Sequence, residues 1–164
     1  MLYTIKSAQA SATISSIGAE LQSLCHRAEA SNSPDQQGAG NNGGHEALWQ
    51  GDPAVWSGRA PILFPIVGAL KNNQYTHEGK TFTLPRHGFA RQAEFTCTAQ
   101  SANSIALQLL ANPDSLSVYP WHFELTIGFT IEQEKLLISY RVVNRLRADR
   151  CSVSGVAVMR GGWH

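Results

Sequence analysis

The sequence has little charge and almost no excess of either sign. Charged residues make up 15% of the 164 residues, and the formal net charge is +1 at pH 7. Proteins that attract nucleic acids or anionic membranes gather Lys and Arg on one face. The composition therefore argues against a nucleic acid or a membrane as a partner. The length is sufficient for one domain with its own hydrophobic core, and we expect residues 1–164 to form a single domain.

Cysteine is scarce, and long apolar runs are absent. Cys25, Cys97 and Cys151 lie far apart, without the C-x-x-C spacing of zinc ribbons and dithiol redox proteins. The scattered histidines do not match a metal-ligand spacing either, so we predict no metal. No segment approaches the roughly 20 apolar residues of a membrane span. The N-terminal stretch MLYTIKSAQASATISS is polar where a signal peptide needs its apolar core, so we expect a cytoplasmic protein.

What the sequence does have is alternation of apolar and polar residues with a period of two. SATISSIGAELQSLCH predicts two strands around a turn at Gly18, and YTHEGKTFTLP predicts a hairpin around Glu78-Gly79. Long helical periodicity is missing. Many short strands in series predict an all-β fold, an antiparallel sandwich or barrel. Four further strands are predicted in AEFTCTAQ, SIALQLLA and FELTIGFTIEQEKLLISYRVVN, with turns at 101–103, 113–120 and 133–134.

One long segment between strands has no large apolar residue. Residues 27–46, RAEASNSPDQQGAGNNGGHE, are rich in Ser, Asn, Gln and Gly. Such a segment cannot bury enough surface to offset the entropy cost of ordering its backbone. We predict a flexible surface loop inserted in a hairpin.

Two prolines interrupt the apolar segment SGRAPILFPIVG. Pro61 and Pro65 each remove a backbone donor, so this segment is predicted to lie at a sheet edge or to cross between sheets. Arg59 precedes the crossing, where its guanidinium can offer a planar set of donors to a hydroxyl-rich or anionic ligand. On spacing alone, an ion pair between Arg59 and Asp52 is the alternative.

A histidine stands at a predicted corner further along. His87 lies between Pro85 and Gly88 in LPRHGFAR, rather than in the middle of a strand. A histidine at a corner can present its ring to a cleft. The alternative is a structural histidine held by hydrogen bonds.

Three segments together carry a resemblance to a known family. LWQGDPAVWSGRAPILFPIVG, YTHEGKTFTLPRHGFAR and YPWHFELTIGFTIEQEKLLISYRVVN resemble aldose 1-epimerases (mutarotases), in particular their short bacterial and hexose-6-phosphate branch. The pairing of RAPILFPI with LPRHGFAR is specific, whereas either motif alone is weak. The resemblance extends from Ile14 to Asn144, without the inserted loop.

The resemblance implies a galactose mutarotase-like supersandwich, a large antiparallel β-sandwich with a sugar-binding cleft. It also implies interconversion of the α and β anomers of a hexose or hexose phosphate, with a small-molecule sugar as partner and no cofactor. In the family a histidine protonates the ring oxygen while a glutamate takes the proton of the anomeric hydroxyl, as general acid-base catalysis requires. By motif position, Arg59, His87 and Arg91 are substrate-binding residues, and His87 is the catalytic candidate. Arg91 would help to hold a phosphate.

The sequence also departs from the family pattern. Ala69 stands in VGALKN where many relatives have arginine, and the loss of a charged hydrogen bond costs roughly 1.5 to 3 kcal/mol. After Asn144, relatives continue into a strand resembling PFSIGGHPAF, whereas this chain reads RLRADRCSVSGVAVMRGGWH. We therefore expect residues 145–164 to be an atypical tail, the sandwich to be incomplete at its C-terminus, and the family's acid and base to be absent.

Two interpretations of this tail remain open. In one, His164 is the family's catalytic histidine displaced by an insertion; in the other, a frameshift replaced the family sequence. In either case we expect little activity from this chain. The alternative function is a non-catalytic carbohydrate-binding sandwich that uses Arg59, His87, Arg91 and a tryptophan face. A third hypothesis is a structural β domain without a ligand.

Overall fold

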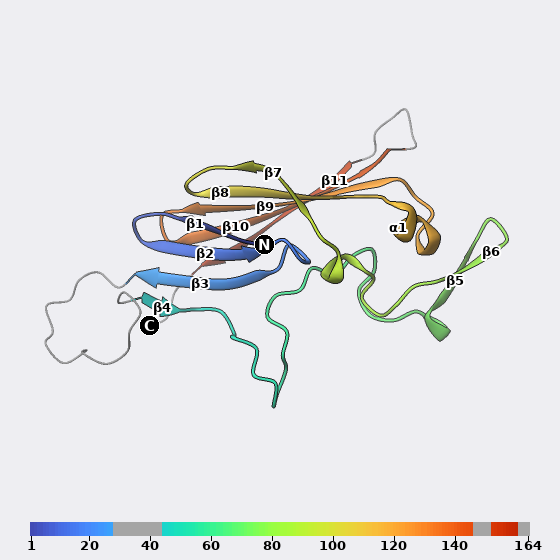
Figure 1. Cartoon of the computed structure of the whole chain (residues 1–164), viewed down its shortest axis with the longest axis horizontal. Coiled ribbons are helices and arrows are strands. Elements are labelled where there is room, and N and C mark those ends of the chain that lie inside the picture. The colour runs from blue at the N-terminus through green and yellow to red at the C-terminus, as the bar shows by residue number, and fades with distance from the viewer. Residues whose placement is uncertain (28–43, 146–151, 161–164) are drawn as a thin grey trace, which may run out of the picture.

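Alternating apolar residues place most strands in two antiparallel sheets that face each other (Figure 1). The computed structural model describes residues 1–27, 44–145 and 152–160. The first sheet has the order β1-β2-β3-β4 and contains β1 (Leu2–Lys6), β2 (Ala10–Ser15), β3 (Leu21–Arg27) and β4 (Gly44–Glu46). The second has the order β11-β10-β9-β8-β7 and contains β7 (Thr96–Gln100), β8 (Ser104–Leu110), β9 (Phe123–Glu132), β10 (Lys135–Asn144) and β11 (Ser152–Arg160).

The hydrophobic core lies between the two sheets. On β9, residues at every second position from Phe123 to Ile131 are buried, and Ile5 and Ile14 are buried on the first sheet. Burial of one such side chain stabilises the fold by about 1.5 to 3 kcal/mol. This packing confirms the predicted all-β antiparallel sandwich.

Hydrogen bonds between loops fix one sheet on the other. The N–H of Lys6 donates to the carbonyl of Ala102 at 2.8 Å, and the hydroxyl of Ser7 donates to the carbonyl of Gln133 at 2.5 Å. At the other end of the first sheet, the N–H of Phe95 donates to the carbonyl of Ser16 at 2.8 Å. The segment leading into β7 is thereby held on the turn between β2 and β3.

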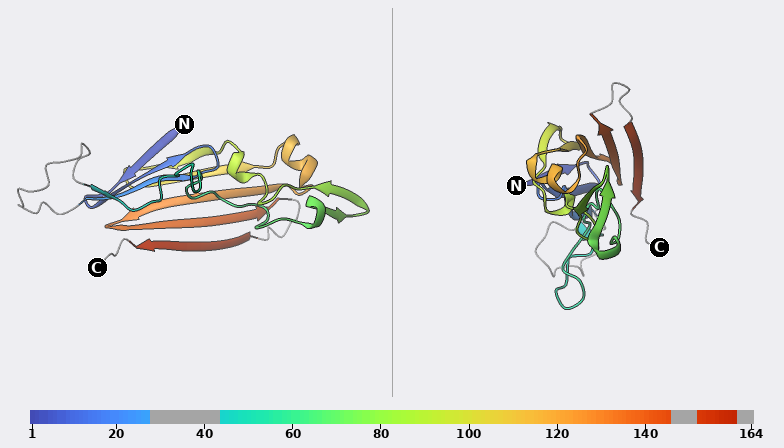
Figure 2. Two further views of the ribbon diagram at one scale, coloured as in Figure 1. Left: turned by 90° about the horizontal axis from the view of Figure 1, so that it is seen from below. Right: turned by 90° about the vertical axis from the view of Figure 1, so that its right-hand side faces the viewer.

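A small hairpin lies outside both sheets, beyond the end of the sandwich (Figures 1 and 2). It consists of β5 (Gln74–His77) and β6 (Lys80–Thr83), joined by Glu78 and Gly79 with φ of 49° and 76°. Two successive positive φ values are typical of the tight turn that matches strand twist. The predicted hairpin is confirmed.

Aromatic rings attach this hairpin to the rest of the chain. Tyr75 stacks on Phe82 and on Trp121, with ring centroids 5.4 and 6.1 Å apart, and its hydroxyl donates to the carbonyl of Val118 at 2.8 Å. Burial of this phenol raises the pKa of Tyr75, with a smaller contribution from Tyr119. The hairpin is thus positioned by residues next to helix α1 (Pro113–Val118).

Most predicted strands are present, but three strands and helix α1 were not predicted. The strands flanking Gly18 and the four later strands are confirmed, and the φ of Gly18 is 69°. Strands β1, β4 and β11 were not predicted. The predicted turn at 113–120 is wrong in part, because α1 occupies most of it, with Asn112 and Ser115 forming a capping box around Pro113.

The predicted loop and tail need correction at their ends. Arg27 ends β3 and pairs with Gly44 in β4, so both ends of the predicted loop 27–46 are strand residues. Residues 28–43 lie outside the described residues. In the tail 145–164, residues 152–160 form β11 and pair with β10, whereas Cys151 and His164 lie outside the described residues.

Glu46 holds the short strand β4 on its neighbour. Its carboxylate accepts hydrogen bonds from the Ser23 hydroxyl at 2.5 Å and from the N–H groups of Leu24 and Leu48 at 2.8 and 2.9 Å. Burial opposes the charged form, but these bonds and a weak one from Cys25 outweigh it and lower the pKa of Glu46. Burial, together with this carboxylate, raises the pKa of the Cys25 thiol. We regard this cluster as structural.

Among residues 1–27, 44–145 and 152–160, no helix has the length and apolar character needed to cross a membrane.

Candidate functional site

The two motifs singled out in the sequence lie against each other. The carbonyl of Phe64 accepts hydrogen bonds from the N–H groups of Phe89 and Ala90 at 3.0 and 3.2 Å, and Phe64 and Gly88 form an isolated bridge. Ala60 bridges Leu21 at the edge of the first sheet. The proline-interrupted segment therefore runs along a sheet edge, as predicted, and from there reaches the corner that carries His87.

His87 is held by hydrogen bonds on its backbone and its ring. Its N–H donates to the carbonyl of Gly68 at 2.7 Å, and its Nδ1 accepts from the N–H of Gly68 at 2.9 Å. The φ of His87 is 69°, a left-handed conformation that costs a non-glycine residue roughly 1 kcal/mol. Such strain persists only where the surroundings determine the conformation.

The tautomer of His87 follows from these contacts. Nε2 of His87 lies 3.1 Å from Nε of Arg86, so both ring nitrogens face an N–H group. A neutral imidazole has one acceptor nitrogen, and therefore only one contact can be a hydrogen bond at a time. The Gly68 donor is fixed by the backbone, whereas Arg86 is an exposed side chain. We therefore assign the acceptor to Nδ1 and the proton of the neutral ring to Nε2.

Aromatic side chains pack against one another next to the corner that carries His87. The ring of Phe64 lies 5.0 Å from that of Phe123 at the start of β9, and the ring of Phe89 lies 5.8 Å from it. Phe64 and Phe89 also meet edge to face at 6.1 Å. Aromatic pairs at these distances each contribute about 0.5 to 1.5 kcal/mol beyond the burial of their area. The corner that carries His87 is therefore held by packed aromatic side chains.

A pocket of about 700 Å³ opens beside His87. This volume lies within the range of small-molecule sites. The lining combines apolar and polar side chains from segments far apart in the sequence: Glu20, Trp56, Ser57, Gly58, Pro61, Leu63, His87, Arg91 and Gln92. The structure thus brings His87 and Arg91 together, as predicted from their shared motif.

Arg59 takes a different position. Its guanidinium Nη1 donates to the carbonyl of Gln22. Arg59 is absent from the described residues that line this pocket. Arg59 and Asp52 do not form the alternative ion pair, and the Asp52 carboxylate accepts from the N–H of Ala54 at 2.8 Å. A substrate contact of Arg59 stays a prediction.

Glu20 is a pocket residue that the sequence did not reveal. Its Oε1 accepts from the N–H groups of Arg59 and Ala60 at 3.2 and 3.1 Å, and its Oε2 accepts from the amide of Gln22 at 2.9 Å. The two backbone donors are 39 and 40 residues away in the sequence. No local spacing marks such a contact. Glu20 fixes the pocket wall through the backbone of the RAPILFP segment.

Two arginines give this side of the site a positive character. Arg91 is exposed on the short helical turn η2 (Ala90–Gln92), and its Nη2 lies 3.4 Å from the carbonyl of Arg86. The guanidinium of Arg86 contacts the ring of His87, as described above. Guanidinium groups bind phosphate and carboxylate well because their donors are planar and permanently charged. Ala69 is exposed beside Gly68 and outside the lining set, and its effect on affinity stays a prediction.

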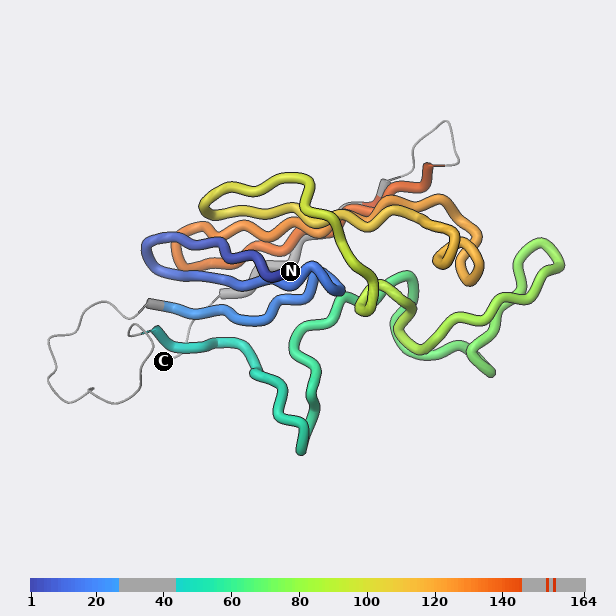
Figure 3. Tube along the Cα trace, in the orientation of Figure 1, coloured from blue at the N-terminus to red at the C-terminus, as the bar shows by residue number. Residues whose placement is uncertain are grey.

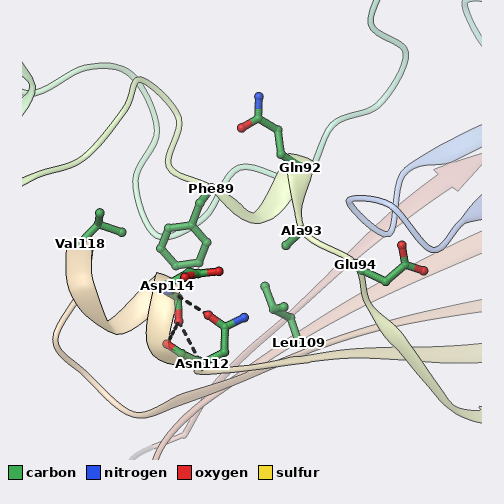
Figure 4. Close-up of a pocket in the computed structure, with 9 residues that line it drawn as sticks. Phe89, Gln92, Ala93, Glu94, Leu109, Asn112, Asp114 and Val118 are labelled. Atoms are coloured by element: carbon green, nitrogen blue, oxygen red, sulfur yellow. Dashed lines mark hydrogen bonds between the residues drawn. The ribbon is translucent and has the colours of Figure 1, made fainter.

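A second pocket, of about 400 Å³, is lined by residues of the same turn and of the α1 region (Figure 4). Phe89 covers it, and Asp114 and Asn112 of the α1 region lie beneath the ring, while Gln92 points away. Asn112 and Ser115 bond to each other in the helix cap at 2.9 Å. The polar groups here serve the helix start, so we regard this pocket as structural.

The described residues hold no cluster suited to a metal. Within residues 1–27, 44–145 and 152–160, no group of three or more His, Cys, Asp or Glu side chains is placed to bind one. The lining of the pocket near His87 offers an imidazole, one guanidinium group, a hydroxyl and a carboxylate.

Comparison with known proteins decides the family. The family model for aldose 1-epimerase matches residues 1–154. The chain belongs to the aldose 1-epimerase family. This confirms the resemblance to the family that the sequence motifs carry.

Among relatives in the aldose 1-epimerase family, the chain is 38% identical over 106 residues to the chromosomal protein LacX of Lactococcus lactis subsp. lactis. This match covers 62% of the chain and 36% of LacX. The chain thus spans about a third of the length of that curated relative.

Solved structures of similar proteins agree on the fold. A galactose mutarotase related enzyme from Lactobacillus acidophilus is 38% identical, with a TM-score of 0.76, over 88% of the chain and 43% of that protein. A galactose mutarotase-like protein from Lactobacillus casei is 30% identical, also with a TM-score of 0.76, over 88% and 44% of the two chains. The two sheets described above are therefore those of galactose mutarotase-like structures.

Proposed function

We propose that the pocket beside His87 binds the ring of an aldohexose or hexose phosphate, and that the whole protein interconverts the α and β anomers of this sugar. The observation that carries the proposal is the joint position of His87 and Arg91 on one pocket. Membership of the aldose 1-epimerase family supports the substrate class.

The geometry of His87 suits a sugar oxygen as its partner. Because Nδ1 accepts from Gly68, the neutral ring carries its proton on Nε2 and can donate it to a hydroxyl or ring oxygen. Arg86 is exposed, and displacement of its side chain by the sugar would leave Nε2 free to make this bond. Arg91, on the same wall, offers charged donors, and together with Arg86 it favours a phosphorylated sugar.

Opening the ring of a hemiacetal needs a second group. One group must protonate the ring oxygen while another accepts the proton of the anomeric hydroxyl, each within hydrogen-bond reach. Among the described residues that line the pocket, Glu20 is the one carboxylate. Both its oxygens already accept hydrogen bonds from Gln22 and from the backbone at Arg59 and Ala60. We therefore propose that this chain holds the sugar and contributes little to proton transfer.

We expect saturation-transfer NMR to detect binding of both anomers of glucose 6-phosphate, because a site for interconversion accommodates both. His87→Ala should weaken binding about tenfold, since it removes a donor aimed at a sugar oxygen. His45→Ala, at an exposed position of β4, should leave binding unchanged.

The same samples report anomer exchange. Two-dimensional exchange spectra should give a rate close to that of buffer. Binding of one anomer alone would contradict the proposed reaction, and no transfer to either anomer would contradict the sugar site. A rate well above buffer that His87→Ala abolishes would contradict the division of roles between binding and proton transfer.

A further inference from the structure

Trp56 combines exposure with a fixed position at the pocket. Its side chain is 50% exposed, although it belongs to the lining of the pocket that contains His87 and Arg91. It lies in the segment between β4 and η1 (Lys71–Asn73), which extends away from the sheets (Figure 3). Because half of this large ring is exposed to water, its burial contributes only part of the stabilisation that a fully buried tryptophan gives.

The backbone of Trp56 is held by several hydrogen bonds. The N–H groups of Val55 and Trp56 donate to the carbonyl of Asp52 at 3.0 and 2.7 Å, and the Asp52 carboxylate accepts from Ala54. The indole Nε1 of Trp49 donates to the carbonyl of Trp56 at 2.9 Å. This tight turn gives Trp56 a defined place although the segment has no regular secondary structure.

Gly58 sets the position of the indole ring. A Cβ at this residue would lie 2.6 Å from Cζ2 and 2.8 Å from Cε2 of Trp56. The ring therefore packs against the backbone of Gly58, in the space where the Cβ of any other residue would lie. Both Trp56 and Gly58 belong to the lining of the pocket, so this contact holds the ring at the pocket wall.

We propose that Trp56 is the aromatic wall of the sugar site and stacks on the apolar face of the sugar ring, while His87 and Arg91 bind its polar groups. This inference rests on the proposed function and adds the residue that recognises the carbon skeleton. A pyranose has a face of C–H groups that loses contact with water when it covers an aromatic ring. Pro61 and Leu63 extend the apolar side of the same pocket.

The test uses the indole N–H signals in nitrogen-proton correlation spectra, each assigned by a Trp→Phe variant, during titration with glucose and with glucose 6-phosphate. The Trp56 indole signal should shift as the sugar binds. Trp56→Ala should weaken binding roughly tenfold, and Trp56→Phe less, because phenylalanine keeps part of the stacking surface. Gly58→Ala should weaken binding with Trp56 still present, because its Cβ displaces the ring.

Trp121→Phe is the matched control, because Trp121 packs on Tyr75 and His77 beside the outlying hairpin. It should leave affinity unchanged. Binding that is unaltered in Trp56→Ala, with His87 and Arg91 signals still shifting, would overturn this inference alone. If no signal of Trp56, His87 or Arg91 responds to either sugar, the inference and the proposed function both fail.

Discussion

Gly88→Ala is expected to lower the free energy of unfolding by at least about 3 kcal/mol, which is a large part of the 5 to 15 kcal/mol typical of a domain. Gly88 has a φ of 70°, and a Cβ there would overlap the carbonyl oxygen of Phe64 and lie 2.6 Å from Cδ of Pro65. Phe64 cannot retreat without losing its hydrogen bonds to Phe89 and Ala90. Urea unfolding followed by tryptophan fluorescence measures the change.

Gly79→Ala separates the two causes of this effect. Gly79 has a similar φ of 76° in the β5–β6 turn, but nothing lies within 4 Å of a Cβ at that position. Only the backbone conformation is penalised there, at about 1 kcal/mol. If the two variants were destabilised equally, the close contact between the two motifs would not be a source of stability.

Glu20→Ala is expected to lower the free energy of unfolding by about 2 to 3 kcal/mol and to weaken sugar binding as well. The substitution removes the acceptor for the N–H groups of Arg59 and Ala60. Hydrogen bonds to charged groups contribute roughly 1.5 to 3 kcal/mol each, and partial exposure reduces this contribution. Urea unfolding gives the stability, and titration with glucose 6-phosphate gives the affinity.

Glu20→Gln is the matched variant, because its amide oxygen can still accept from both backbone donors. It should retain about half of the lost stability. A Glu20→Ala variant within about 0.5 kcal/mol of the wild type would show that these bonds exchange freely with water. The wall formed by the RAPILFP segment would then not depend on Glu20.

The strands could be predicted from the sequence where alternation is regular and a turn residue marks the end. The hairpin at Glu78-Gly79 and the long pair β9 and β10 satisfy both conditions. Helix α1 was missed although Asn112 and Pro113 are a helix-start signal, because the helix has six residues and no periodicity. Strand β1 is short and mostly exposed, so little apolar alternation marks it.

The candidate site could be predicted only in part. His87 and Arg91 share one motif, so proximity in the sequence already places them together. Glu20 could not be found, because its contacts join segments far apart in the chain. The guanidinium of Arg59 turns to the carbonyl of Gln22, and that direction depends on how β3 lies beside the crossing segment. Such positions follow from the tertiary structure rather than from a local pattern.

Binding of the sugar in the pocket of His87 and Arg91 can be followed residue by residue. The experiment is a titration of the nitrogen-15 labelled chain with glucose 6-phosphate, recorded in nitrogen-proton correlation spectra. We predict dose-dependent shifts at the backbone N–H groups of His87 and Arg91, which line the pocket, and of Gly68, which donates to the ring of His87, and we predict that His87→Ala abolishes the shifts of Gly68 and Arg91. Shifts confined to residues 112–118 of the second pocket, or none, would contradict the claim.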